Sequence, residues 1–390
     1  MYLTSGASSL LDGEAAERAL AIAERIFQCG VRWTDEHMTA RPETIGAYGG
    51  CVLVAHALGR AGREPAPSLR ELLQRALVTA PDRRGLYDGR AGLLVVLDAL
   101  DPDGRSFARP RAALRDAIAA DLLEVGELEP SDRDAFDLIH GAAGKLIALH
   151  DPPAGVAAHV CARFATLADR FEERLADPDP EPAARLDLGV AHGIPGILAA
   201  LNVALPGERA LARRYVELVL ASAHAVNGAH RWGPIWERDR VPPPRRAWCY
   251  QTAGVASVLL DRAALDGDDA LRALALGALG ATLHEPDIEH WDDALCHGRS
   301  GVALLYARVE AGDERFLSAA RGLANDVLNA YDDAAPFGYR AINLLTLGRE
   351  DRPQFLDAAL GIALFLIEAA YPSQRNWLPL FGLLPGGAPR

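Results

Sequence analysis

The sequence predicts an all-α fold, an (α/α) toroid or barrel of about seven helical hairpins. Three observations predict it. A glycine-containing turn followed by an apolar helical run returns along the chain, amphipathic helical stretches separate these runs, and alternating strand-like patterns are nearly absent. The repeats occupy almost the whole sequence, so we expect a single (α/α) barrel domain over residues 1–390.

The repeated run combines a glycine turn with a short helix that is apolar nearly all round. The helix-opening positions follow one another at intervals of 40 to 58 residues, which is typical of a repeated supersecondary unit. Such a helix is expected to be buried, on the inside of the fold. The copies are IGAYGGCVLVAHAL (45–58), LYDGRAGLLVVLDAL (86–100), DLIHGAAGKLIALH (137–150), GVAHGIPGILAALN (189–202), WCYQTAGVASVLL (248–260), LCHGRSGVALLYA (295–307) and a weaker copy, PFGYRAINLLTLG (336–348).

Longer amphipathic stretches lie between these copies and predict an outer layer of helices. They are Gly13–Phe27, Ser68–Thr79, Phe107–Leu123, Val156–Leu175, Leu211–Val226, Asp269–Leu283, Glu314–Ala330 and Gln354–Ala369. Closure into a toroid is favoured because short, alanine- and glycine-rich helices can crowd around a common axis. An open solenoid is the alternative, since the last copy lacks a full glycine turn and could serve as a capping repeat.

One long segment, residues 231–248 (RWGPIWERDRVPPPRRAW), interrupts the pattern and leads directly into Cys249. Long structured loops in compact domains are often functional. The segment is therefore interpreted either as a lid or wall over a substrate or as a simple connection.

The composition excludes several classes of protein. The chain has 40 basic and 53 acidic residues, a net charge of −13, which argues against nucleic-acid binding. The N-terminus lacks a signal-peptide pattern and no apolar run approaches the ~18 residues of a membrane span, so we expect a cytoplasmic protein. Cys29, Cys51 and Cys161 lie in apolar helical surroundings and are expected to be small buried hydrophobes.

Two cysteines and a histidine lie at the turns of two consecutive copies. Cys249 precedes the apolar run at 254–260, and Cys296 and His297 precede the run at 301–306. Consecutive copies of a repeat are expected to be neighbours in space, so these turns should meet at one rim. Two thiolates and one imidazole are a known ligand set of a catalytic zinc, which keeps a fourth position open. A buried core thiol is the alternative for either cysteine.

The segments Trp248-Cys249-Tyr250, Cys296-His297-Gly298 and His192-Gly193-Ile194-Pro195-Gly196 carry a family resemblance. With the glycine-turn copies, they resemble the lanthionine synthetase C-like family over essentially the whole chain. This resemblance implies a seven-fold (α/α) toroid with zinc held at its rim by Cys249, Cys296 and His297. It also implies a cyclase that closes thioether rings in lanthipeptides.

The implied reaction adds a cysteine thiolate of a peptide to a dehydroalanine or dehydrobutyrine in the same peptide. Zinc deprotonates a coordinated thiol, and the addition produces an enolate that must be protonated at its α-carbon. His192 is the expected acid, because AHGIPG aligns with CHGRSG and the family has an acid/base histidine there. A capping or hydrogen-bonding histidine is the alternative.

Three more residues match family positions near the metal. Asp137 should orient His192 or a zinc-bound species, although it could instead cap the helix that follows. Arg245, rather than Arg246, should steady the developing enolate, with a solvated surface arginine as the alternative. Tyr250 should donate a hydrogen bond there, or form an aromatic wall.

The chain also departs from the family pattern. Gln251 stands where the family usually has glycine, and Ala253 stands where it usually has proline. Glycine permits a positive φ or close substrate approach, so these changes bear on substrate range and activity. His140 and His290 are further rim histidines to which the sequence assigns no role.

The expected partners are a dehydrated precursor peptide and a separate dehydratase, since the repeats leave no room for a dehydratase region. The alternative function is a non-cyclising protein that binds zinc and a thiol or peptide. A barrel glycoside hydrolase is disfavoured because it needs a pair of carboxylates, whereas this rim offers thiols and imidazoles.

Overall fold

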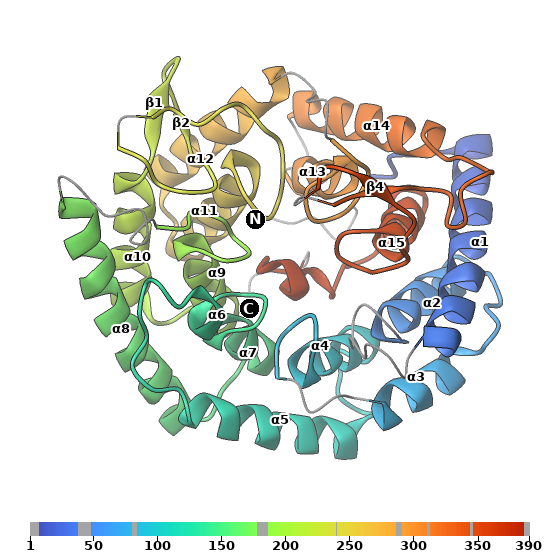
Figure 1. The fold of residues 1–390 in the computed structure, drawn as a ribbon, viewed down its shortest axis with the longest axis horizontal. Helices are drawn as coiled ribbons and strands as arrows, with labels where there is room; N and C mark the ends of the chain where they lie inside the picture. Colours follow the sequence, from blue (N-terminus) through green and yellow to red (C-terminus); the bar gives the residue numbers. More distant parts are fainter. Residues whose placement is uncertain are drawn as a thin grey trace.

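The computed structural model describes residues 8–37, 48–79, 84–177, 186–238, 240–285, 291–309, 313–343 and 346–385. Its helices form two concentric rings, and the chain alternates between a longer outer helix and a shorter inner one (Figure 1). The predicted all-α toroid of seven hairpins is confirmed. That residues 1–390 form a single domain stays a prediction.

The outer helices follow the predicted amphipathic stretches. Several begin at a side chain that caps the first turn. Ser68 and Glu71 form a capping box before α3 (Leu69–Val78), and Asp268 and Asp313 cap α12 (Asp269–Ala281) and α14 (Glu314–Asn329). The outer ring consists of α1 (Gly13–His37), α3 (Leu69–Val78), α5 (Ala108–Leu123), α8 (Ala154–Ala176), α10 (Arg209–Ala221), α12 (Asp269–Ala281) and α14 (Glu314–Asn329).

The inner helices are buried almost completely, as their apolar sequences predict. They are α2 (Gly50–Arg60), α4 (Arg90–Leu100), α7 (Ala142–Leu149), α9 (Ile194–Ala204), α11 (Thr252–Asp266), α13 (Arg299–Ala307) and α15 (Ala359–Ala370). Each begins at one end of the ring and ends at the other, so the turns that precede them gather at a single rim.

A glycine in the first turn of these helices allows the chain to fold tightly. A Cβ atom on Gly301 would lie 1.9 Å from the carbonyl oxygen of Leu295, six residues earlier. The same offset recurs in other copies, where a Cβ on Gly254 would lie 2.0 Å from the Trp248 oxygen. No side chain fits at this position, which explains why the glycine recurs with the repeat.

The ring closes between its first and last helices. The outer helix α1 packs against α15, and α15 in turn packs against the inner helix α2. The backbone N–H groups of Leu10 and Leu11 donate to the carbonyl oxygen of Ala369, at 2.7 and 3.0 Å. The toroid is therefore closed and the open-solenoid alternative is wrong.

The seventh inner helix lies later than predicted. The segment 336–348 contains no helix in its described residues; it contributes β3 (Ala341–Ile342), which pairs with β4 (Arg349–Glu350). The predicted outer stretch Gln354–Ala369 instead supplies the inner helix α15. A Cβ atom on its glycine, Gly361, would lie 2.0 Å from the carbonyl oxygen of Phe355, six residues earlier. This is the same contact as in the other copies.

A second hairpin was also missed. The predicted helical stretch Leu211–Val226 ends at Ala221, and β1 (His224–Val226) pairs with β2 (Ala229–Arg231). Asn227 and Gly228 join the strands with φ angles of 51° and 80°, as a type I′ turn requires. Short helices α6 (Arg133–Phe136) and η3 (Thr282–His284) complete the connections.

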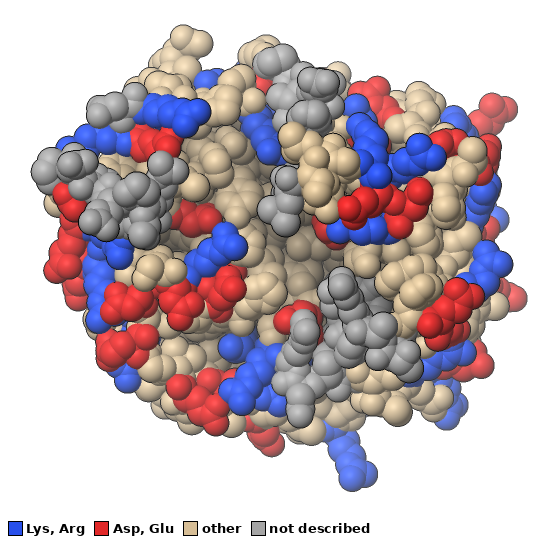
Figure 2. Space-filling model, viewed as in Figure 1, with Lys and Arg blue, Asp and Glu red and all other residues tan. Residues whose placement is uncertain are grey.

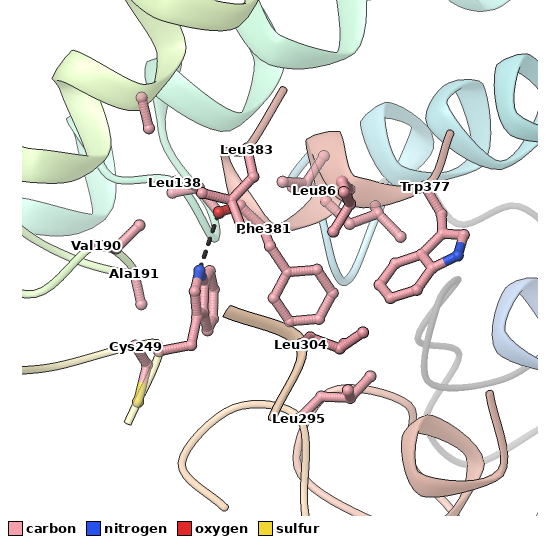
Figure 3. Packing of buried hydrophobic residues seen from close by; sticks show 14 of the residues in the cluster. Leu86, Leu138, Val190, Ala191, Cys249, Leu295, Leu304, Trp377, Phe381 and Leu383 are labelled. Carbon is pink, nitrogen blue, oxygen red and sulfur yellow. Dashed lines mark hydrogen bonds between the residues drawn. The ribbon is translucent and has the colours of Figure 1, made fainter. Parts of the chain in front are cut away.

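The C-terminal segment fills the centre of the ring, where η4 (Leu378–Phe381) lies between the inner helices (Figure 1). The indole Nε1 of Trp248 donates to the Phe381 carbonyl oxygen at 2.9 Å, and the two rings pack edge to face (Figure 3). Tyr87 donates to the Leu380 carbonyl oxygen. This segment therefore forms a floor beneath the turn that carries Cys249.

Viewed down the ring axis, the surface is hollowed at its centre (Figure 2). The visible walls of the hollow are mostly uncharged, while lysine, arginine, aspartate and glutamate gather around it. Within the described part of the chain, no helix has the length and apolar character that crossing a membrane requires.

Candidate active site

A belt of backbone hydrogen bonds joins the turns at the rim. In five places a turn donates an N–H to the carbonyl oxygen of the next turn in sequence. The bonds run from Leu86 to Ile139 (2.8 Å), Leu138 to Ala191 (3.1 Å), Ala191 to Cys249 (3.1 Å), Cys249 to Cys296 (3.1 Å) and Cys296 to Leu356 (2.9 Å). The turns around residues 137, 192, 249 and 297 are consequently direct neighbours, and their side chains can act on one ligand.

The structure brings Cys249, Cys296 and His297 together. One ligand atom from each lies within 4.8 Å of the others. Cys249 and His297 are buried, with 2% and 3% of their surfaces exposed, and Cys296 is partly buried. The sequence-based prediction that two consecutive turns place these three side chains side by side agrees with this geometry.

The two thiols shift each other's pKa in opposite directions. The hydrogen bond from Cys296 lowers the pKa of Cys249 to about 5, with help from His297 and against the effect of burial. The same hydrogen bond, together with burial, raises the pKa of Cys296 well above its ordinary value. The thiolate is the form in which cysteine binds metal ions, so the lowered pKa of Cys249 favours metal binding.

His297 is held beside a buried carboxylate. Its Nε2 atom lies 3.2 Å from Oδ2 of Asp292, which is 1% exposed and also accepts from the N–H groups of Ala294 and Ile342. Burial lowers the pKa of His297, but Asp292 and Cys249 outweigh it and raise the pKa to about 10. Asp292 thus contacts one ring nitrogen of His297, and Nδ1 is the ring nitrogen that remains for another ligand.

These residues fit a metal ion of the zinc type. Neither ring nitrogen of His297 makes a well-aligned hydrogen bond although both are buried, and a buried polar atom without a partner needs an explanation. Two sulfur atoms and an imidazole nitrogen match the borderline-soft ligands that zinc prefers. The Asp292–His297 contact resembles the carboxylate–histidine pairs that orient metal-binding imidazoles.

His192 and Asp137 form a dyad beside this cluster. Nδ1 of His192 lies 2.6 Å from Oδ2 of Asp137, whose side chain is fully buried. The other carboxylate oxygen accepts from the N–H groups of His140 and Gly141, at 2.7 and 2.8 Å. One oxygen of Asp137 therefore holds the turn before α7 and the other contacts the imidazole, while the N-cap of α7 is Gly141 and not Asp137.

Tyr250 packs beside His192 of the dyad. Its ring centroid lies 5.9 Å from that of His192. A Cβ on Gly189 would lie 2.5 Å from the tyrosine ring and 2.6 Å from the Cys249 carbonyl oxygen, so only glycine allows this approach. Burial, then the nearby Asp187, raises the pKa of Tyr250, so its hydroxyl keeps its proton and can donate.

The two neighbouring arginines have different surroundings. Arg245 lies close enough to Cys249 that its charge contributes to the lowered pKa of that thiol, and its buried Nε has no hydrogen-bond partner. Arg246 instead stacks on Trp291, with its guanidinium carbon 4.3 Å from the ring centroid. The geometry supports Arg245, not Arg246, as the cation of the site.

Gln251 has a conformation that suits glycine. Its φ and ψ angles are 86° and 176°, a region that side chains rarely adopt, and the residue is 4% exposed. Ala253 lies buried in the first turn of α11. The His140 side chain is 43% exposed beside Asp88, and His290 lies outside the described residues.

Sequence reasoning missed two carboxylates, Asp292 and Asp187. Each stands five residues before the histidine of its turn, His297 and His192, and each accepts from the N–H two residues later. The shared spacing was a signal that could have found them. Burial raises the pKa of Asp187 to about 6, against the hydrogen bond from Gly189.

The segment 231–248 packs against the dyad's own turn. Trp236 donates its N–H to Leu186 at 2.8 Å, Leu188 donates to Pro234 at 2.9 Å, and Trp232 is completely buried. The segment therefore forms part of the wall of the candidate site on the side of the His192 turn. A role as a mobile lid stays a prediction.

Comparisons with known proteins agree with this geometry. The family model described as lanthionine synthetase C-like protein matches residues 61–381. Among solved structures, the chain is similar to nisin cyclase, with a TM-score of 0.65 and 17% sequence identity over 92% of this chain and 97% of that chain. At this identity the likeness shows a common fold. No curated protein matches the chain.

Proposed function

The chain belongs to the lanthionine synthetase C-like family, and on that premise we propose that it is a zinc-dependent lanthipeptide cyclase. It would add cysteine thiolates of a dehydrated peptide to dehydroalanine or dehydrobutyrine residues of the same peptide, forming thioether rings. The observation that carries the proposal is the His192–Asp137 dyad on a turn that hydrogen-bonds directly to the Cys249 turn.

Cys249, Cys296 and His297 would hold the zinc ion, with Asp292 orienting the histidine. When bound, zinc supplies a lowered pKa for a coordinated substrate thiol, which is otherwise mostly protonated at neutral pH. Arg245 adds a positive charge beside the same thiols and favours the anionic form of a sulfur nearby.

The thiolate sulfur forms a bond to the β-carbon, and the electrons of the carbon–carbon double bond move toward the carbonyl oxygen as an enolate. His192 would then give its Nε2 proton to the α-carbon, while Nδ1 keeps its bond to Asp137. The proton lost by the substrate thiol restores the imidazolium, so the reaction consumes and releases none. The buried Asp137 carboxylate stabilises the protonated ring during this exchange.

Arg245 and Tyr250 would stabilise the enolate oxygen. A guanidinium and a protonated phenol are donors that gain strength as negative charge develops on an acceptor in a water-poor site. Tyr250 is held by close packing on Gly189, and Arg245 retains an unpaired buried Nε atom. Both therefore have donors to offer near the reacting atoms.

The proposed reaction needs a peptide that already contains dehydroalanine or dehydrobutyrine, because the thiolate adds to their carbon–carbon double bond. Dehydration of serine or threonine must therefore come before ring closure. We propose a separate dehydratase as the partner that supplies the dehydroamino acids.

The test uses a synthetic peptide that contains one dehydroalanine and one cysteine. Free thiol is measured by alkylation and mass spectrometry, with zinc-loaded protein and with no protein, and chiral analysis reports the product. We expect wild type to accelerate closure, and His192→Ala to lose about 10²-fold or more of that acceleration with its zinc retained.

His140→Ala is the matched control, because His140 also precedes its turn glycine but is exposed beside Asp88. It should close the ring at the wild-type rate. Tight binding of the peptide thiol without any acceleration would contradict the cyclase and support the alternative, a non-cyclising zinc- and thiol-binding protein.

A further inference from the structure

A cavity of about 380 Å³ lies at the end of the ring opposite the candidate active site. It is bounded by the C-terminal halves of α2, α4 and α15 and by residues 373–377, which lead into η4. The candidate active site lies where the inner helices begin, so the two sites are separated by the length of these helices. The size is that of a small-molecule site.

Two buried side chains that line this cavity have donors without partners. Arg375 is 4% exposed, and its Nη2 atom has no hydrogen-bond partner among the described residues. Trp377 is also 4% exposed; its indole Nε1 points away from Phe381 and has no partner in the same part of the chain (Figure 3). A buried donor without a hydrogen-bond partner costs free energy of folding. Because both donors belong to residues that line the same cavity, one ligand with two acceptor atoms could satisfy both.

The nearby carboxylate does not satisfy these donors. Glu368 accepts from the hydroxyl and the N–H of Ser373, at 2.6 and 2.9 Å, and lies 3.5 Å from Nε of Arg375. It therefore faces one side of the guanidinium and leaves Nη2 free. Burial lowers the pKa of Arg375 while Glu368 raises it, as expected for a cation removed from water.

The walls of the cavity are apolar on the other side. Leu53, Ala57 and Leu364 contribute methyl groups, and the indole of Trp377 adds a flat surface. Arg60 lines the same cavity and is exposed, so a second cation stands toward solvent. The cavity therefore combines a guanidinium group and an indole N–H on one side with apolar side chains on the other.

We propose that this cavity binds an organic carboxylate with an apolar body, one oxygen on the Arg375 guanidinium and the other on the Trp377 N–H. A monoanion fits better than phosphate, because Glu368 and the C-terminal ends of three helices place negative charge around it. Planar guanidinium groups also match carboxylate geometry. The carboxylate comes either from a free acid or from the C-terminus of a peptide.

Isothermal titration calorimetry on the full-length protein tests this proposal. The probes are 4-methylpentanoate, its amide, inorganic phosphate, and the tripeptide Gly-Gly-Leu with a free or amidated C-terminus. We expect the acids to bind and both amides and phosphate to fail. Tighter binding of the free acid than of the tripeptide identifies a small acid as the source, and the reverse order identifies a peptide terminus.

Two conservative variants report on the two donors. Arg375→Lys keeps the positive charge but loses the planar guanidinium group with its paired N–H donors. Trp377→Phe keeps an aromatic ring but loses the N–H. Each should weaken binding about tenfold or more, whereas Arg70→Gln, an exposed arginine on α3, should not. The helical content of all three, measured by circular dichroism, should equal wild type, which checks their fold independently of the cyclase proposal.

Equal affinity for the acid and its amide would overturn the proposal, as would the absence of binding by any acid at millimolar concentration. Wild-type affinity in both Arg375→Lys and Trp377→Phe would do the same. Should Arg375→Lys fail to fold, Trp377→Phe still decides the result, because its packing is nearly unchanged.

Discussion

Asp137→Asn isolates the part that the carboxylate plays in the dyad. The amide oxygen can still accept from the N–H groups of His140 and Gly141, so the turn before α7 should keep its shape. The amide nitrogen then faces Nδ1 of His192 and makes that atom an acceptor. The doubly protonated ring, which the proposed acid step needs, would face a donor instead of an anion.

The size of the effect follows from the bond that is lost. Nδ1 of His192 and Oδ2 of Asp137 are 2.6 Å apart, and the carboxylate is fully buried. A hydrogen bond to a charged group contributes about 1.5–3 kcal/mol, and about 1.4 kcal/mol corresponds to a tenfold rate change. The closure rate should therefore fall at least about 10- to 100-fold, with more lost through the wrong tautomer.

The assay compares initial closure rates of the dehydrated peptide, with zinc content and thermal unfolding measured on the same samples. Asp134→Asn is the matched control, since Asp134 lies near the same dyad but is exposed and its charge is screened. A wild-type rate in a folded, zinc-loaded Asp137→Asn protein would refute the reasoning. A similar loss in Asp134→Asn would also refute it.

Four further substitutions test other parts of the structure. Asp292→Asn should weaken metal binding about 10- to 100-fold by chelator competition, because the contact with His297 loses its charge; unchanged affinity would exclude an orienting role. Gly301→Ala should lower the unfolding free energy by about 3 kcal/mol or more, since its Cβ would lie 1.9 Å from the Leu295 oxygen. Gly277→Ala is the control, because no atom lies within 4 Å of the Cβ it would add, and it should stabilise α12 by up to ~1 kcal/mol. If Gly301→Ala and Gly277→Ala changed the unfolding free energy equally, the proposed role of the tight turn would be contradicted. Gln251→Gly should raise the unfolding free energy by about 1 kcal/mol in urea titrations, because it relieves a φ of 86°; a loss would show that the side chain's burial outweighs the strain.

The fold could be predicted because its physical requirement is local. The inner helices α7, α9, α11, α13 and α15 each have a glycine where the chain folds back on the carbonyl six residues earlier, so the residue recurs with the repeat. The seventh inner helix was predicted in the wrong place because its turn has Ala358 where other copies have their first glycine. Gly338, earlier in the chain, resembled that glycine. Gly338 serves another purpose, since its φ is 77° and a Cβ there would lie 2.2 Å from the Tyr331 ring.

Only the site residues that stand in the repeated turn motifs could be predicted from the sequence. Cys249, Cys296, His297 and His192 stand in turns with a shared pattern, so neighbouring copies imply neighbouring side chains. Which carboxylate meets which histidine does not follow from the pattern. His192 bonds Asp137 of the preceding copy, whereas His297 contacts Asp292 of its own copy, although Asp187 and Asp292 have the same spacing.

The opposite end of the ring could not be predicted at all. Residues 371–385 have no repeat, and their positions depend on long-range contacts such as the bond between Trp248 and Phe381. Arg375 and Trp377 reach one cavity only because this segment turns back between α2, α4 and α15. Contacts of that kind come from packing of distant segments and leave no local signal.

The most direct test of the account is zinc content per chain, measured by elemental analysis on wild type, Cys249→Ala and Cys296→Ala. The account predicts about one zinc in wild type and little in either variant, because both thiols belong to one set of ligands. Cys161→Ala, which changes a thiol on the outer helix α8, should keep the wild-type content. No zinc in wild type, or full zinc in both variants, would contradict the convergence of the two turns on a metal ion and with it the proposed cyclase.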